Sequence, residues 1–178
     1  MDHIRHYMKI GFMYFCAAAV FAGGISQLGS YLINETIAEN DTRRIFPYLY
    51  FTHIRNHGGI FGVAEGKGWI FGLVSLIFIG GLVWWVKRYP MRRWENICVG
   101  LIVGGGLSNV LDRVIYGSVI DFIDVKGIPN WYFIFNTADL LIHIGIWPML
   151  IMSFFISELD VNNIPQKKGY VETVSEAD

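Results

Sequence analysis

The chain has 178 residues, of which 53% are hydrophobic and only 16% are charged, and its mean hydropathy is +0.42. Soluble domains carry about 25% charged residues, so much of this apolar surface must face something other than water. The net charge of −1 and the lack of any basic run with interleaved aromatic residues argue against a nucleic-acid partner. Cys16 and Cys98 lie far apart in apolar runs, a pattern that fits buried core residues and neither a disulfide framework nor a metal site.

Four apolar segments follow one another along the chain, each close to the ~20 residues that an α-helix needs to cross the hydrocarbon core of a membrane. Helices are expected because backbone polar groups inside lipid must be paired within their own segment. The first segment exceeds the ~7–15 apolar residues of a signal-peptide core, so we expect a retained helix. The segments cover residues of about 8–33, 69–86, 94–116 and 138–157.

The connection over about 34–68 is too long for a bare turn. Its sequence IFPYLYFTHIRNHGG combines aromatic and β-branched residues with Gly58 and Gly59, which is typical of one or two short strands and a glycine turn. We therefore expect a small extracytoplasmic β element that rests on the membrane.

The orientation follows from the loop between the second and third segments, whose sequence VKRYPMRRW holds four basic residues. Basic clusters of this kind stay in the cytoplasm, so alternation puts both termini inside and the connections 34–68 and 117–137 outside. The predicted fold is an all-α membrane protein with four transmembrane helices. We expect one integral-membrane domain over 1–158 and a polar cytoplasmic tail over 159–178.

Two aspartates, Asp121 and Asp139, lie among large apolar residues in SVIDFIDV and FNTADLLIH, at the predicted outer membrane boundary. An ionisable group at membrane depth is costly, so such a residue is a functional candidate. Two adjacent carboxylates can share one proton, and the pair can then activate a water and polarise a substrate carbonyl. This predicts peptide hydrolysis without a metal or a covalent intermediate. The alternative is that each aspartate caps a helix or pairs with an arginine.

A polar helical face lies near the outer end of the third segment, in GGGLSNVLDRVIYG. Asn109, Asp112 and Arg113 share this face because they are three and four residues apart. Arg113 either pairs with Asp112 or binds a substrate carbonyl or an anionic head group. Asn136, three residues before Asp139, can bond the backbone or orient a substrate.

Earlier in the same segment, Gly100 and Gly104 form a GxxxG pattern. Small residues at this spacing let two helices approach closely. Helix packing is therefore the role that we expect for these glycines.

None of the histidines lies in a sequence motif of a metal site or of a serine-protease triad. His143 lies four residues after Asp139 on the same helical face, and it either tunes the aspartate pair or packs as a polar residue inside the bundle. His53 and His57 lie in the outer connection without matching metal ligands. The absence of H-E-x-x-H and G-x-S-x-G argues against zinc and serine peptidases.

Together these stretches resemble lipoprotein signal peptidase, also called signal peptidase II. That family has N-x-x-D-R, G-x-V-x-D-F and F-N-x-A-D motifs in this order, which match residues 109–113, 117–122 and 135–139. The stretch IRNHGGIFG, residues 54–62, resembles the family's R-N-x-G-x-x-F motif. The likeness covers most of residues 10–157 and includes the four-helix topology and the chain length.

The resemblance implies an aspartic endopeptidase of the bacterial inner membrane that removes signal peptides from diacylglyceryl-modified prolipoproteins. It assigns catalysis to Asp121 and Asp139, with no metal and no cofactor. It also implies contact with membrane lipids and sensitivity to globomycin-type inhibitors, and we expect a monomer. Motif residues would line the substrate site, with Asp112 supporting Arg113; they are Asn56, Gly58, Asn109, Asp112, Arg113 and Asn136.

One departure concerns the first helix, where the family's D-Q-x-[ST]-K motif is replaced by SQLGS, residues 26–30, and only Gln27 is shared. An acid and a base are lost together, which is less harmful than the loss of one partner of an ion pair. Two alternatives stay open. A paralogue that binds lipid-modified peptides without cleaving them is supported by the changed motif and opposed by the intact Asp121 and Asp139. A small proton-relay transporter would need further ionisable residues at mid-membrane depth, and the first two segments have none.

Overall fold

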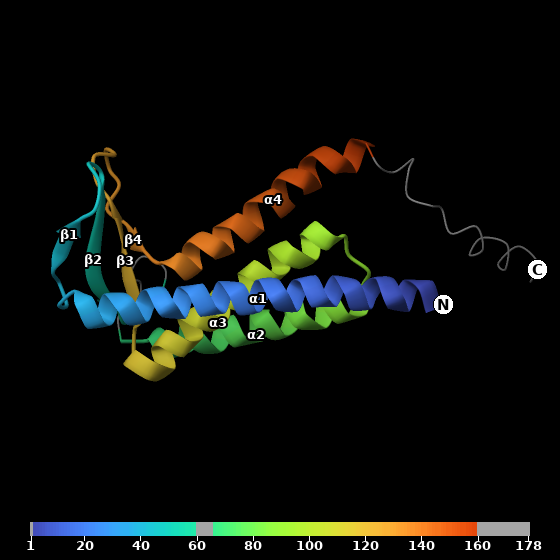
Figure 1. Cartoon of the computed structure of the whole chain (residues 1–178), viewed down its shortest axis with the longest axis horizontal. Coiled ribbons are helices and arrows are strands. Elements are labelled where there is room, and N and C mark those ends of the chain that lie inside the picture. Colours follow the sequence, from blue (N-terminus) through green and yellow to red (C-terminus); the bar gives the residue numbers. More distant parts are fainter. Residues whose placement is uncertain (1, 60–65, 160–178) are drawn as a thin grey trace, which may run out of the picture.

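The computed structural model describes residues 2–59 and 66–159, and Figure 1 shows a bundle of helices with a small sheet at one end. The predicted polar tail lies outside the described residues from position 160 onward, as does the end of the IRNHGGIFG motif. Three helices, α1 to α3, are long and apolar enough to cross a membrane, and α4 adds a further apolar stretch over Thr137–Ser153. Each helix contains one of the four predicted apolar segments, so the predicted fold class is confirmed. The helices are α1 (Asp2–Thr36), α2 (Gly68–Arg88), α3 (Arg93–Tyr116) and α4 (Thr137–Leu159).

The central element of the bundle is α3, which packs against α1, α2 and α4. Its glycines allow this close packing. Gly100 and Gly104 face α1, and a Cβ atom on Gly100 would lie 2.5 Å from the carbonyl oxygen of Phe15. A Cβ atom on Gly105 would lie 2.7 Å from the carbonyl oxygen of Ala138 in α4. The predicted packing role of the GxxxG pattern is confirmed, because any side chain here would push a neighbouring backbone away.

Large apolar side chains also cover the outside of the bundle. In water such a continuous apolar surface would mark a partner or an aggregation site, whereas in a membrane it is the surface that faces lipid. Examples that are more than half exposed are Val20, Phe21, Ile77, Phe78 and Trp147, on α1, α2 and α4.

The sheet is fully antiparallel, with the strand order β1-β2-β3-β4. The predicted β element over 34–68 supplies only β1 and β2. The other two strands come from the connection over 117–137, for which no strands were predicted. The strands are β1 (Thr42–Arg44), β2 (Leu49–Asn56), β3 (Val119–Val125) and β4 (Ile134–Phe135).

Apolar packing fixes β3 against the end of α1. Ile120 and Phe122 are buried in one cluster with Ile33 of α1 and with Ile37, which directly follows that helix. Side chains alternate along a strand, so the residue between them, Asp121, points to the opposite face of the sheet. The apolar residues on either side of Asp121, Ile120 and Phe122, therefore anchor the strand that carries it.

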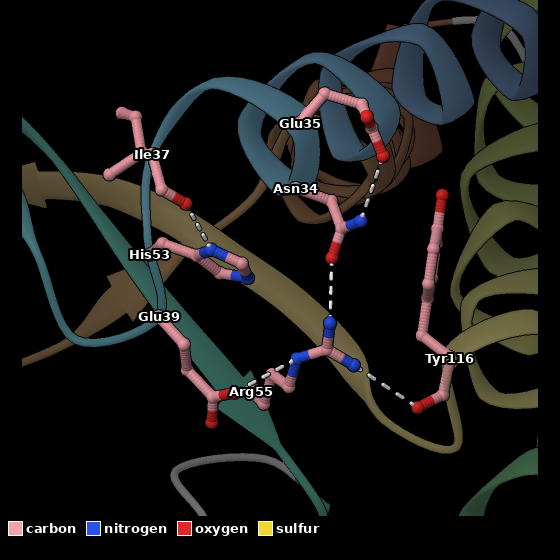
Figure 2. A network of polar contacts seen from close by, with 7 residues as sticks. All are labelled: Asn34, Glu35, Ile37, Glu39, His53, Arg55 and Tyr116. Carbon is pink, nitrogen blue, oxygen red and sulfur yellow. Dashed lines mark hydrogen bonds and ion pairs between the residues drawn. The ribbon is translucent and has the colours of Figure 1, made fainter.

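Polar contacts fix β2 at the same place, as Figure 2 shows. Arg55 of β2 donates from Nη2 to Oδ1 of Asn34 at 2.7 Å and from Nη1 to the carbonyl oxygen of Tyr116 at 3.4 Å, and so ties the ends of α1 and α3 together. The buried His53 ring lies with Nδ1 2.7 Å from the carbonyl oxygen of Ile37. His53 thus closes the turn after α1 and does not stand free in an outer loop.

Candidate active site at the junction of the sheet and the helices

Polar side chains from four parts of the chain converge where the sheet meets α3 and α4. These parts are the end of β2, the C-terminal half of α3, the middle of β3 and the start of α4. The residues that they bring together are Asn56, Asn109, Arg113, Asp121, Asn136 and Asp139.

Two asparagine amides hold the carboxylate of Asp121. Asn56 donates from Nδ2 to Oδ2 at 3.0 Å, and Asn136 donates from Nδ2 to Oδ1 at 2.8 Å. The side chain of Asp121 is only 5% exposed, so both oxygens depend on these donors. Hydrogen bonds to a buried carboxylate are needed because an unpaired one would carry a large desolvation cost.

Asp139 and Asn136 cap the start of α4 reciprocally. The backbone N–H of Asp139 donates to Oδ1 of Asn136 at 2.9 Å, and the backbone N–H of Asn136 donates to Oδ2 of Asp139 at 3.3 Å. This is the geometry of a capping box, which satisfies backbone donors in the first turn of a helix. The alternative that Asp139 caps a helix is therefore correct, and the same side chain also belongs to the polar site.

Asn109 closes the link between the two aspartates. It donates from Nδ2 to Oδ1 of Asp139 at 2.9 Å and accepts a hydrogen bond from Nδ2 of Asn136 at 3.1 Å on its own Oδ1. Because the Nδ2 of Asn136 also reaches Asp121, three side-chain amide contacts connect one carboxylate to the other. The arrangement fixes both aspartates relative to one another and to three elements of the fold.

Burial raises the pKa of Asp121 from 3.8 to about 7, and the neighbouring carboxylate of Asp139 adds to this increase. The hydrogen bonds from Asn56 and Asn136 act in the opposite direction, since they stabilise the charged form. A carboxyl with a pKa near neutral can hold or release a proton at the pH of the cell. Such a group beside a second carboxyl is suited to acid–base chemistry.

Arg113 supplies positive charge close to both aspartates. Its Nη1 donates to the carbonyl oxygen of Asn109 at 2.9 Å, and its Nη2 donates to the carbonyl oxygen of Gly58 at 3.2 Å. Gly58 in turn donates its N–H to Oδ1 of Asn56 at 3.0 Å. The alternative in which Arg113 pairs with Asp112 is not formed among the described residues, and the guanidinium binds the Gly58 turn beside the site instead.

Asp112 lies apart from the other predicted site residues. It is 1% exposed and turns toward α1, where Gln27 donates to Oδ1 at 2.7 Å and Ser30 donates to Oδ2 at 2.9 Å. The backbone N–H of Ile120 also donates to Oδ2, at 3.2 Å. The predictions that Asp112 lines a substrate site and supports Arg113 do not match this geometry, because all of its contacts face α1 and the start of β3.

The roles of Gln27 and Ser30 were not predicted from the sequence. The signal that pointed to them was the replaced first-helix motif, in which the glutamine is shared with the family. In the structure that glutamine and the hydroxyl of Ser30 together satisfy a buried carboxylate. Neutral donors from α1 therefore hold Asp112, whose carboxylate in turn binds the backbone N–H of Ile120, the residue before Asp121.

His143 is exposed, so the prediction that it packs inside the bundle is wrong. Its Nδ1 lies 2.8 Å from the carbonyl oxygen of Asp139, one turn earlier in α4. Within residues 2–59 and 66–159, no three histidine, cysteine or acidic side chains gather as a metal site would require.

Comparisons with known proteins agree on one group. The model of the family described as "Signal peptidase (SPase) II" matches residues 16–155. A protein named lipoprotein signal peptidase from Listeria monocytogenes serotype 4a (strain HCC23) is 32% identical over 145 residues, which cover 80% of this chain and 94% of that protein. A protein of the same name from Shewanella loihica is 30% identical over 161 residues, covering 88% and 93%. The fold is similar to a bacterial membrane enzyme solved by the in meso method at 2.3 Å resolution, with a TM-score of 0.72, 29% identity and coverage of 88% of this chain and 94% of that one.

Proposed function

The chain belongs to the signal peptidase II family and is therefore a protease that removes signal peptides from prolipoproteins; we propose that it is an aspartic endopeptidase with Asp121 and Asp139 as its catalytic pair. The observation that carries this proposal is that one amide, Asn136, contacts both aspartates. No other pair of carboxylates in the described residues shares such a bridge.

The proposed reaction uses one proton shared by the pair. The raised pKa of Asp121, about 7, is consistent with one carboxyl staying protonated near neutral pH. The ionised carboxylate takes a proton from a water molecule, whose oxygen attacks the scissile carbonyl, while the protonated carboxyl donates to the carbonyl oxygen. The tetrahedral intermediate then breaks at the C–N bond, the leaving nitrogen receives the proton taken from water, and a hydroxyl of the intermediate returns its proton to the other carboxylate, which restores the pair. No covalent intermediate and no metal are needed.

The substrate backbone is proposed to bind beside the pair. Arg113 keeps a buried Nε without a partner in the described part of the chain, and its charge faces both aspartates. Asn56, Gly58 and Asn109 surround the same point through the contacts described above. We assign these residues and Asn136 to substrate binding and orientation, and Asp112 to positioning of β3.

The topology proposed for the enzyme follows the distribution of basic residues. Both termini lie in the cytoplasm, the aspartate pair lies at the outer face, and residues 1–158 form the peptidase unit. The substrate is a diacylglyceryl-modified prolipoprotein that enters sideways from the bilayer, since its lipid anchor and apolar signal helix reside there. The chain acts as a monomer in contact with membrane lipids and is inhibited by globomycin-type compounds.

The alternatives are not favoured. A binding protein without activity was suggested by the changed first-helix motif, yet Gln27 and Ser30 leave Asp112 fully hydrogen-bonded. A proton relay finds no support from the relatives, which are named as peptidases.

The test is cleavage of a purified, diacylglyceryl-modified prolipoprotein by the purified full chain, followed as a shift on a gel. Asp121→Asn and Asp139→Asn should each lower the rate by about 10³-fold, within the range that a general acid or base contributes. Asp124→Asn is the matched control, because Asp124 lies on the same strand but binds Thr52 and Lys126 outside the site. Cleavage by the Asp121 or Asp139 variant at the wild-type rate would contradict the assignment, and wild-type cleavage should stop when globomycin is added.

A further inference from the structure

A groove lies between α1 and α2 at the end of the bundle far from the sheet. Figure 1 shows the N-terminal end of α1 beside the C-terminal end of α2, with the strands at the opposite end. The groove has a volume of about 380 Å³. Its walls combine apolar side chains with two basic ones, and the residues are Met8, Lys9, Phe12, Met13, Val86 and Lys87.

The two ammonium groups at the groove are available to a ligand. Lys9 and Lys87 are both exposed, and neither forms an ion pair with another side chain that the structure describes. The Nζ atom of Lys87 lies 5.5 Å from the centre of the Phe12 ring. This cation–π contact places the exposed charge beside the apolar wall of the groove.

The groove also lies at the depth where lipid head groups are expected. At about 1.5 Å per residue, a helix of the length of α1 measures roughly 50 Å, against about 30 Å for the hydrocarbon core, so α1 extends beyond it. Trp84 and Tyr89 contact edge to face beside Lys87, with ring centres 6.1 Å apart. Tryptophan and tyrosine are enriched at the boundary between hydrocarbon and head groups. Apolar walls on the membrane side and ammonium groups on the water side therefore match the two parts of a lipid.

We propose that this groove is a binding site for an anionic phospholipid. Its phosphate lies between the ammonium groups of Lys9 and Lys87, and one acyl chain runs along Met8, Phe12 and Met13. Basic pockets between transmembrane helices are suited to anionic head groups. A zwitterionic lipid would place its own positive charge close to the two lysine ammonium groups, which would repel it. The site is separate from the aspartate pair, which lies at the other end of the bundle, and does not depend on the proposed catalytic mechanism.

The test measures lipid retention directly. The full chain is released from detergent micelles in a native mass spectrometer after addition of phosphatidylglycerol or phosphatidylethanolamine with identical acyl chains. Wild type should retain one phosphatidylglycerol in preference to phosphatidylethanolamine. The Lys9→Gln/Lys87→Gln variant should bind phosphatidylglycerol about 25-fold more weakly, roughly fivefold for each basic residue removed.

Two matched variants decide what the loss means. Arg5→Gln/Arg88→Gln removes the same charge from the same end of the bundle without touching the groove walls and should keep the preference. Lys9→Arg/Lys87→Arg keeps both charges at the groove and should also keep it. Equal loss in the Arg5/Arg88 variant would show a diffuse charge effect and overturn the site, as would an unchanged preference in the glutamine variant. Should the double glutamine variant fail to fold, the single variants decide, each with an expected loss of about fivefold.

Discussion

Replacement of Asn136 by serine separates the two roles that this residue has in the structure. Serine is a good N-cap, so its hydroxyl can still accept the backbone N–H of Asp139 and keep the start of α4. Its side chain is too short to replace the amide that donates to Asp121 at 2.8 Å and to Asn109 at 3.1 Å. Asn136→Ser should therefore remove the bridge between the aspartates while the helix cap stays.

The expected magnitudes follow from these contacts. A hydrogen bond to a charged group contributes about 1.5–3 kcal/mol, which corresponds to a rate lower by roughly 10- to 100-fold if the bond orients the pair in the transition state. Asn136→Ser should also lose about 1–3 kcal/mol of stability, because the buried Asp121 carboxylate loses one of its two amide donors. Asn136→Ala should lose the same activity and about 1 kcal/mol more stability than Asn136→Ser, because the cap is lost as well.

The pH profile provides a signature that a merely structural role would not give. The amide of Asn136 lowers the pKa of Asp121 by stabilising its charged form, so its removal should raise that pKa further above about 7. The alkaline limb of the cleavage rate should accordingly move to higher pH in Asn136→Ser. The assay is prolipoprotein cleavage from pH 5 to 9, with unfolding in detergent followed in parallel. Wild-type rates and an unshifted pH profile in Asn136→Ser would refute the bridging role.

Three further outcomes follow from the same contacts. The pKa of Asp121 rises from 3.8 to about 7 on folding, so the folded chain binds more protons than the unfolded chain between these pH values. The unfolding temperature should therefore fall as the pH rises from 4 to 7. Asp121→Asn should make the unfolding temperature less dependent on pH in this range. Ser30→Ala removes a 2.9 Å hydrogen bond from the buried Asp112 and should cost about 1–3 kcal/mol in thermal unfolding. Gly100→Ala should destabilise the bundle by about 1–3 kcal/mol, because the new Cβ would lie 2.5 Å from the carbonyl oxygen of Phe15.

Neighbouring positions provide controls for these measurements. The hydroxyl of Ser26 is buried without a partner among the described residues, so Ser26→Ala should be neutral or slightly stabilising where Ser30→Ala is costly. Gly80 has open space around its Cβ position, so Gly80→Ala should not destabilise the chain. A loss in both members of either pair would mean that the assay reports side-chain change in general and not the contacts described here.

The carboxyl pair shows how far local sequence could lead. Asp121 and Asp139 were predicted as one site because each lies among apolar residues near a predicted membrane boundary. The structure gives the reason for those apolar neighbours at Asp121, since Ile120 and Phe122 anchor β3 against α1. The bridge through Asn136 and Asn109 could not be predicted, because it joins residues 27 positions apart in sequence.

The polar face of α3 shows where local sequence misled. Asn109, Asp112 and Arg113 are close enough in sequence to share one side of the helix. At 3.6 residues per turn, however, adjacent positions point about 100° apart, so Asp112 and Arg113 can serve different neighbours. Asp112 turns to α1 and Arg113 to the Gly58 turn.

The four apolar helices could be predicted from composition and segment length alone. Apolar side chains in segments of this length are stable in lipid, and in lipid the backbone groups are paired by forming a helix. That β3 and β4 complete the sheet became clear from the folded chain, because strand pairing depends on partners far away in sequence. A short apolar strand also has the same local composition as the end of an apolar helix. The folded chain likewise shows which donors satisfy Asp112 and which amides join Asp121 to Asp139. Those contacts depend on how α1, α3 and the sheet dock, and the docking is set by glycine contacts and apolar packing that no single segment contains.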